Sequence, residues 1–319
     1  MTRSCTTSKQ IVYLALLGNL LVTVTKVVAA ALTGSAAMLS EAVHSLVDSA
    51  NEGLLLHGYR TALRRPDSLH PLGYGRELYF WSFIVALLLF GLGAGVSLYQ
   101  GVQHVLTPKV IDHPYVSYIV LACAFLFEGM SWLVAFRKLR ATRGNLGYWQ
   151  AIHGSKDPPS FMVLFEDSAA LVGIIIAALG TFLSQQLALP MLDGVASILI
   201  GLVLAAVATI LAYESKSLLI GEPASPVLVS AVVALALKEP GVVSANGAFT
   251  VHLSPDQILV ALSVEFSDDL RSPELEYCVE AIETRIRDAH PEIITLFIKP
   301  QTPERFAQWK RLQYGAIDL

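Results

Sequence analysis

The sequence predicts an α-helical membrane protein that carries a small α+β domain at its C-terminal end. Only 15% of the 319 residues are charged and the mean hydropathy is +0.57, whereas soluble domains carry about 25% charged residues. The long apolar runs stop near residue 220, and strand and helix patterns of a globular domain follow. This composition leaves too few polar residues to cover a soluble enzyme. The net charge of −4 also argues against a nucleic-acid partner.

Six apolar segments are each long enough to cross a hydrocarbon core, which takes about 20 helical residues. They cover residues 10–32, 36–59, 78–101, 114–136, 161–184 and 190–213. The first segment follows Lys9, as the apolar part of a signal peptide would. It is long, however, contains Asn19 and Lys26, and has no clear small-residue cleavage site. We therefore expect a retained span and six transmembrane helices.

Lysine and arginine are concentrated in the N-terminal tail, in the loops after the second and fourth segments, and after the sixth. The opposite loops hold only Lys109. Because cytoplasmic loops carry this excess, both termini are expected to face the cytoplasm or its organellar equivalent. The lack of an Arg- and Ser-rich, acid-poor presequence favours a bacterial inner membrane over a mitochondrial one.

After residue 220 the periodicity changes. A helical run, PVLVSAVVALALKEPG, is followed by two alternating strands, GVVSANGAFTVHL and QILVALSVEF, by an amphipathic helix and by a last strand, IITLFIKP. The order αββαβ predicts a two-layer α+β domain. We therefore expect a transmembrane domain at 1–220, an α+β domain at 221–301 and a C-terminal tail at 302–319.

The second apolar segment carries the densest set of charges, which cost at least about 2–3 kcal/mol each in a membrane. Glu41, His44, Asp48 and Glu52 are three or four residues apart and share one helical face. His44 and Asp48 could bind one divalent cation through an imidazole nitrogen and a carboxylate oxygen. The alternative is an internal hydrogen bond in the bundle, but the number of ionisable residues favours a metal.

Other charges lie in the first, fourth and fifth segments. Glu166 and Asp167 are adjacent, so their side chains point about 100° apart, and we expect one to face inward and the other to pair with a neighbour. Glu128 is a candidate metal ligand, proton carrier or structural partner. Lys26 is expected to neutralise one of these acids. The alternative is that its ammonium reaches the interface between membrane and water.

A site built from imidazole and carboxylates binds metal in competition with protons. If it faces each side of the membrane in turn, this competition exchanges protons for metal, with protons entering and metal leaving. The sequence has no HExxH motif of a metalloprotease, and its three cysteines are too far apart for a CxxC site. We therefore expect no enzyme and no organic cofactor.

Four stretches of the sequence resemble the cation diffusion facilitator family. They are GSAAMLSEAVHSLVDSANEG, PDSLHPLGYGRELYFW, FEGMSWLVA and DPPSFMVLFEDSAALVG. The sequence of these stretches is most similar to the branch that contains animal zinc transporter nine. The resemblance covers nearly all of residues 10–301. It implies six transmembrane helices, a cytoplasmic ferredoxin-like domain, a homodimer, and export of zinc ions in exchange for protons.

The resemblance also implies a metal site made by two residues four apart on the second segment and two on the fifth. His44 and Asp48 match the first pair, in the version associated with zinc, and Asp167 matches one position of the second pair. Val163 occupies the other position and cannot bind metal. The candidates for the fourth ligand are Glu166, which we rank first, Glu128 and water.

Two further family sites are incomplete in this sequence. In the loop after the second segment Asp67 and His70 match, but Tyr74 stands where the family has a histidine, so we expect a reduced or absent site. The alternative for Asp67 and His70 is a capped, solvated turn. In the C-terminal domain His252 and His290 are too widely spaced to suggest a metal cluster, and we expect this domain to serve dimerisation.

Two other functions remain open. The first is transport of another divalent metal, such as manganese, cobalt, nickel or iron(II), although the imidazole of His44 favours zinc over manganese. The second is a non-transporting membrane adaptor whose C-terminal domain binds a partner. This function is compatible with the lack of a metal ligand at Val163.

Overall fold

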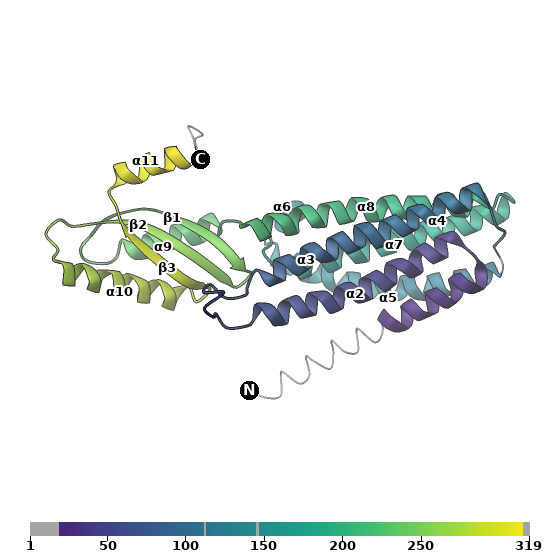
Figure 1. The fold of residues 1–319 in the computed structure, drawn as a ribbon, viewed down its shortest axis with the longest axis horizontal. Helices are drawn as coiled ribbons and strands as arrows, with labels where there is room; N and C mark the ends of the chain where they lie inside the picture. The colour runs from purple at the N-terminus through teal and green to yellow at the C-terminus, as the bar shows by residue number, and fades with distance from the viewer. Residues whose placement is uncertain (1–18, 112, 145–146, 315–319) are drawn as a thin grey trace, which may run out of the picture. The chain divides into compact units, whose positions relative to one another are not determined.

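The computed structural model describes residues 19–111, 113–144 and 147–314. They form two compact units (Figure 1). One contains the helices up to Lys216, and the other contains the loop Ala62–Arg76 together with the chain from Ser217 onward. Residues 10–18 of the first predicted span lie outside the described residues.

The first unit is a bundle of long helices. A helix covers residues 19–33 and α2 covers Ala36–Ala62. The next crossing consists of α3 (Glu77–Leu88), a π-helical turn η1 (Leu89–Ala94) and α4 (Gly95–Leu106). The remaining helices are α5 (Pro114–Thr142), the short α6 (Tyr148–His153), α7 (Pro158–Gln186) and α8 (Met191–Ile220).

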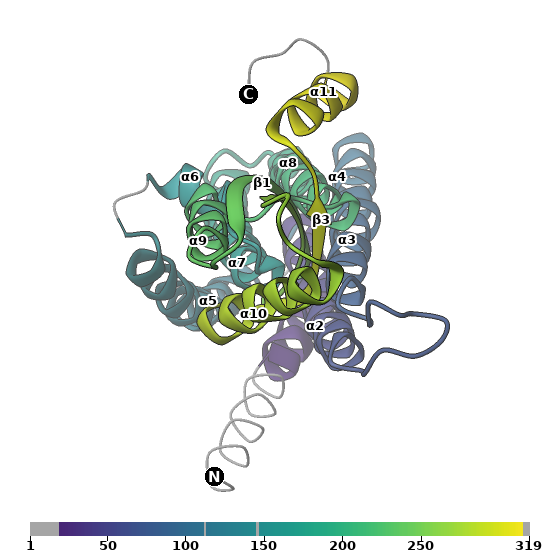
Figure 2. The ribbon, with the colours of Figure 1, turned by 90° about the vertical axis from the view of Figure 1, so that its left-hand side faces the viewer.

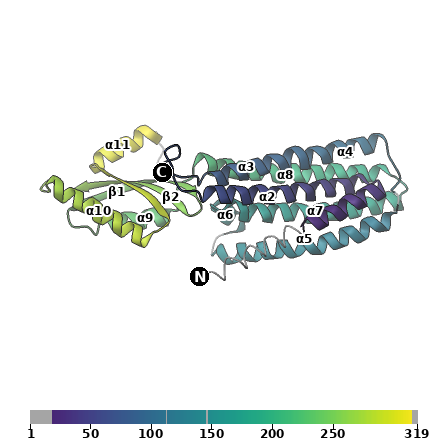
Figure 3. The ribbon, with the colours of Figure 1, turned by 60° about the horizontal axis from the view of Figure 1, so that its bottom comes forward.

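The composition of these helices fits a membrane. Among the described residues, four stretches are long and apolar enough to cross one: Glu77–Leu106, Pro114–Ala141, Pro158–Gln186 and Met191–Ile220. Helix α2 and the helix at 19–33 lie alongside them in the bundle (Figure 3). Large apolar side chains such as Leu126 and Val134 of α5 are 68% exposed, as expected of a surface that faces lipid. The predicted class, a helical membrane protein, is confirmed.

Glycines bring the backbones of α4 and α8 into contact. A Cβ atom on Gly101 would lie 2.7 Å from the backbone nitrogen of Ile198, and one on Gly194 would lie 2.9 Å from the carbonyl oxygen of Gly101. Small residues allow this approach between membrane helices, where association depends on close packing rather than on the hydrophobic effect. Any side chain at either glycine would separate the two helices.

The N-terminus of α2 is capped by a carboxylate from another helix. Asp193 lies in the first turn of α8 and is fully buried. It accepts hydrogen bonds from the hydroxyl of Ser35 (2.6 Å) and from the backbone amides of Ala36 (2.5 Å) and Ala37 (3.3 Å). Amides at a helix N-terminus lack partners within the helix and favour an anion. Asp193 therefore fixes the start of α2 against α8.

The Asp193→Ala variant is expected to lower the free energy of unfolding by about 2 kcal/mol, because buried amides of α2 lose their acceptor. Thermal unfolding in detergent measures the effect. Asp193→Asn, which keeps one acceptor oxygen, should lose less. Equal melting temperatures for the alanine variant and the unmodified protein would contradict the proposed cap.

The second unit has the predicted order αββαβ. Its elements are α9 (Pro226–Ala236), β1 (Val242–Ser254), β2 (Gln257–Phe266), α10 (Ser272–Ala289) and β3 (Ile293–Pro300). The sheet order is β1-β2-β3, with β1 and β2 antiparallel and β2 and β3 parallel (Figure 1). Figure 2 views this sheet from its end and shows α9 and α10 beside it. Alternate residues of β2, among them Val260 and Leu262, pack with Val232 of α9 and Ile282 of α10 in one buried cluster. The domain therefore has two layers.

Part of the stretch expected to be a tail is helical. Helix α11 covers Pro303–Tyr314, and the ring of Phe306 lies 3.1 Å from the position a Cβ would take on Gly247 of β1. The hydroxyl of Thr302 accepts from the amide of Arg305 at 3.4 Å. The signal was present in the sequence, because a threonine followed by proline is a common helix start.

Candidate functional site

Helix α2 places its ionisable residues along one side, as their spacing predicts. His44 is fully buried, and its Nδ1 lies 3.4 Å from Oδ1 of Asp48, whose side chain is 19% exposed. Among the described residues, the two ring nitrogens of His44 have no well-formed hydrogen bond. The same holds for Oδ1 of Asp48. Buried polar atoms without partners are uncommon in native proteins. Imidazole nitrogens and carboxylate oxygens of this kind are chemically able to bind a cation.

A cavity of about 40 Å³ lies beside this pair, between α2, α5 and α7. One water molecule needs about 10–15 Å³ of such space, so the cavity has room for a small cation. The lining is rich in carboxylates, with Asp48, Glu52, Glu128, Glu166 and Asp167. Asn19, Ser45, Leu55, Ser131 and Val163 complete the lining. Three helices that are distant in sequence therefore direct acidic side chains at one small space.

The adjacent acids of α7 both line this cavity, although we expected only one to face inward. Glu166 is buried, and its Oε1 accepts a hydrogen bond of 2.8 Å from the amide of Asn51 on α2. Asp167 is partly buried and its Oδ2 has no hydrogen-bond partner among the described residues. The cavity therefore extends far enough along α7 to be lined by two adjacent side chains. Val163 adds an apolar side chain to the lining.

Lys26 neutralises two acids of the bundle. Its fully buried ammonium lies 3.2 Å from Oε2 of Glu41, 3.7 Å from Oε1 of Glu128 and 2.7 Å from the hydroxyl of Ser45. The prediction that Lys26 pairs with an acid is confirmed, and the alternative that it reaches the interface is wrong. Glu128 is therefore an ion-pair partner as well as a cavity-lining residue.

The described side chains at the cavity do not have the arrangement of a complete metal site. No group of three or more histidine, cysteine, aspartate or glutamate side chains is already arranged as a metal site in the part of the chain that the structure describes. His44 and Asp48 are close together, and Asp48 shares the cavity with Glu166 and Asp167. The ligand set inferred from the sequence therefore stays a prediction.

The loop residues Asp67 and His70 form a hydrogen-bonded turn in the second unit. Oδ1 of Asp67 accepts from the amides of Leu69 (3.0 Å) and His70 (2.7 Å), and Oδ2 accepts from the hydroxyl of Tyr74 (2.6 Å). The Tyr74 hydroxyl, and then these amides, hold the pKa of Asp67 below its usual value. Both oxygens are engaged, which favours the capped turn over a metal site.

The two histidines of the α+β domain each have a local neighbour. Nδ1 of His252 in β1 lies 3.2 Å from the carbonyl oxygen of Ser254. Nδ1 of His290, just after α10, lies 3.2 Å from Oε1 of Glu292. Both contacts are with residues two positions along the chain and need no metal.

Three polar residues that bind or position residues of the bundle were not predicted from the sequence. Asn51 lies three residues after Asp48 and holds Glu166, so extending the polar face of α2 by one position would have found it. Ser45 binds Lys26, and Asp193 caps α2. Ser45 lies four residues after Glu41 and three before Asp48, so the same polar face points to it. The local sequence carries no signal for the cap made by Asp193, because its partners lie at the start of another helix.

Comparison with known proteins gives one family. The profile of the cation efflux transmembrane domain matches residues 12–220. The human protein named proton-coupled zinc antiporter SLC30A9, mitochondrial, is 33% identical over 236 residues, which are 73% of this chain and 42% of the relative. Metal tolerance protein C4 of Arabidopsis thaliana is 35% identical over 168 residues, 52% of this chain and 37% of the relative. The cation-efflux pump FieF of Cronobacter sakazakii is 25% identical over 261 residues, 81% of each chain.

The profile match covers the described helices of the bundle, which contain the cavity and its carboxylates. The chain spans less than half the length of the human and Arabidopsis relatives, so the family rests on the shared bundle rather than on whole-length correspondence. The profile match over residues 12–220 takes in most of the chain. This multi-pass integral membrane protein therefore belongs to the cation diffusion facilitator family, on the branch that contains animal zinc transporter nine.

Proposed function

We propose that the protein exports zinc in exchange for protons and binds the metal between α2 and α7. The observation that carries this proposal is a set of buried atoms that have no hydrogen-bond partner among the described residues. They belong to Asp48 and Asp167, which line one small cavity, and to His44, which lies next to Asp48. Both nitrogens of His44, Oδ1 of Asp48 and Oδ2 of Asp167 belong to this set. Imidazole and carboxylate together suit zinc better than manganese, which prefers oxygen ligands alone.

Glu166 is the proposed fourth ligand. To bind metal, Glu166 would give up one hydrogen bond from the neutral amide of Asn51 and gain the bond to the metal. Glu128 would have to leave the buried ammonium of Lys26, 3.7 Å away. Because breaking a buried ion pair costs more than exchanging a neutral hydrogen bond, Glu166 is the better candidate, and Glu128 remains the structural partner or proton carrier.

Proton exchange follows from the chemistry of these ligands. Imidazole and carboxylates release protons when they take up metal and release metal when they take up protons. With both termini in the cytoplasm, as the basic loops predict, a proton gradient directed inward drives zinc outward. We further propose that the protein is a homodimer joined through the α+β domain and that its host is a bacterial inner membrane.

Zinc uptake into proteoliposomes under an imposed pH gradient tests the function. We expect zinc flux to rise with the gradient and to fall when an ionophore collapses it. Zinc flux that does not respond to the gradient would overturn proton coupling. No flux of any metal, despite correct insertion, would favour the non-transporting adaptor. The same vesicles with manganese, cobalt, nickel and iron(II) identify the preferred metal.

A further inference from the structure

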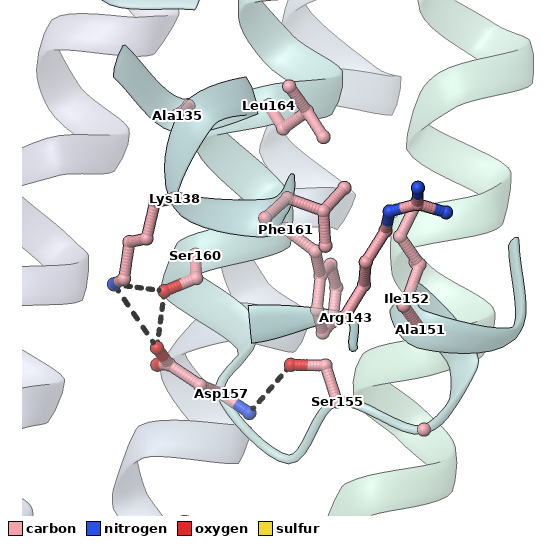
Figure 4. A pocket seen from close by; sticks show the side chains of 12 residues that line it. Ala135, Lys138, Arg143, Ala151, Ile152, Ser155, Asp157, Ser160, Phe161 and Leu164 are labelled. Carbon is pink, nitrogen blue, oxygen red and sulfur yellow. Dashed lines mark hydrogen bonds and ion pairs between the residues drawn. The ribbon is translucent and has the colours of Figure 1, made fainter. Parts of the chain in front are cut away.

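A second pocket, of about 320 Å³, lies where α5, α6 and α7 meet (Figure 4). It shares no lining residue with the cavity between α2, α5 and α7. One part of its lining is apolar and includes Ala135, Leu139, Phe161 and Leu164. The other part carries charges and hydroxyls. A ligand for this pocket therefore needs a polar group and an apolar one.

Two cationic side chains near the end of α5 face this pocket. Lys138 donates a hydrogen bond of 2.7 Å to the hydroxyl of Ser160 and lies 3.8 Å from Oδ2 of Asp157. The guanidinium of Arg143 lies over the ring of Tyr148, 4.2 Å from its centroid. Lys138 balances Asp157, so the three charged side chains of the lining sum to one positive charge.

The neighbouring surface has the composition of a membrane interface. Tyr148 and Trp149 of α6 are 40% and 54% exposed, and aromatic residues of this kind gather at the level of the lipid headgroups. Arg137 and Arg140 of α5 are exposed close by in sequence. A short helix with exposed aromatic rings beside a basic helix end is the pattern typical of headgroup depth.

We propose that this pocket binds the phosphate of an anionic phospholipid, whose acyl chain lies along the apolar part of the lining. A phosphodiester carries one negative charge, which matches the net charge of the lining. The planar guanidinium of Arg143 suits two phosphate oxygens, and basic pockets between membrane helices are a known mode of lipid recognition. Free phosphate offers the same polar chemistry, but it would leave the apolar lining in contact with water.

Native mass spectrometry of the full chain in detergent tests the proposal with three probes: phosphatidylglycerol, phosphatidylcholine and inorganic phosphate. We expect phosphatidylglycerol to bind most tightly. Arg143→Gln should weaken its binding about tenfold or more, as for the loss of a hydrogen bond to a charged group. Arg140→Gln removes the same charge from the same helix but does not line the pocket, and it should leave binding unchanged.

Several outcomes would overturn the proposal. Equal weakening by Arg143→Gln and Arg140→Gln would assign the binding to general surface charge. Equal binding of phosphatidylcholine would remove the requirement for an anionic headgroup, and tight binding of inorganic phosphate would assign the pocket to free phosphate. If Arg143→Gln does not fold, Arg143→Lys decides, because it keeps the charge and loses the paired donors, and unchanged binding would exclude a guanidinium contact. The measurement needs no transport activity, so it is independent of the proposed function.

Discussion

Replacing Asp48 with alanine is expected to reduce zinc transport by at least about 100-fold while the protein still inserts and folds. Oδ1 of Asp48 lies 3.4 Å from the ring of His44 and has no hydrogen-bond partner among the described residues. Removing this carboxylate leaves His44 as the only proposed metal ligand on α2. Even groups that only orient a metal ligand change affinity about 10- to 100-fold, so loss of a ligand should have a larger effect.

The measurement is zinc uptake into proteoliposomes, with the amount of inserted protein determined in the same vesicles. Asp67→Ala is the matched control, since it removes an acid from the loop turn and not from the cavity. It should transport at the rate of the unmodified protein. Full zinc transport by Asp48→Ala would exclude Asp48 from the site and with it the central part of the proposed function.

Replacing Lys26 with methionine is expected to lower the free energy of unfolding by about 3–5 kcal/mol. The ammonium of Lys26 is fully buried and lies 3.2 Å from Glu41 and 3.7 Å from Glu128. The substitution keeps the apolar stem and leaves two carboxylates without their cation. Removing one partner of a buried ion pair has this cost because the remaining charge stays uncompensated.

Thermal unfolding in detergent measures the effect, and two variants make it specific. Lys26→Met combined with Glu41→Gln removes the uncompensated charge of Glu41 and should recover most of the loss. Lys109→Met removes an exposed lysine outside the cluster and should change stability by less than about 0.5 kcal/mol. A single Lys26→Met variant as stable as the double variant would contradict an ion pair between Lys26 and Glu41.

Much of the fold was predictable because its signals are local. The apolar segments, the order αββαβ and the shared face of Glu41, His44, Asp48 and Glu52 all follow from periodicity. The helix α11 was missed although its start, Thr302 before Pro303, is also a local signal. Tyr74 at the loop was predicted to weaken the metal site there, and the structure adds that its hydroxyl binds Asp67.

The sequence alone determined which charged side chains lie within long apolar helices and on which face, because hydropathy and helical spacing fix the position of each residue along its own helix. It could not determine which helices meet. That Lys26 pairs with Glu41 and Glu128, that Asn51 holds Glu166, and that Asp193 caps α2 was decided by tertiary packing. These contacts join residues up to 158 positions apart, and such pairings depend on how helices pack, which no local pattern encodes.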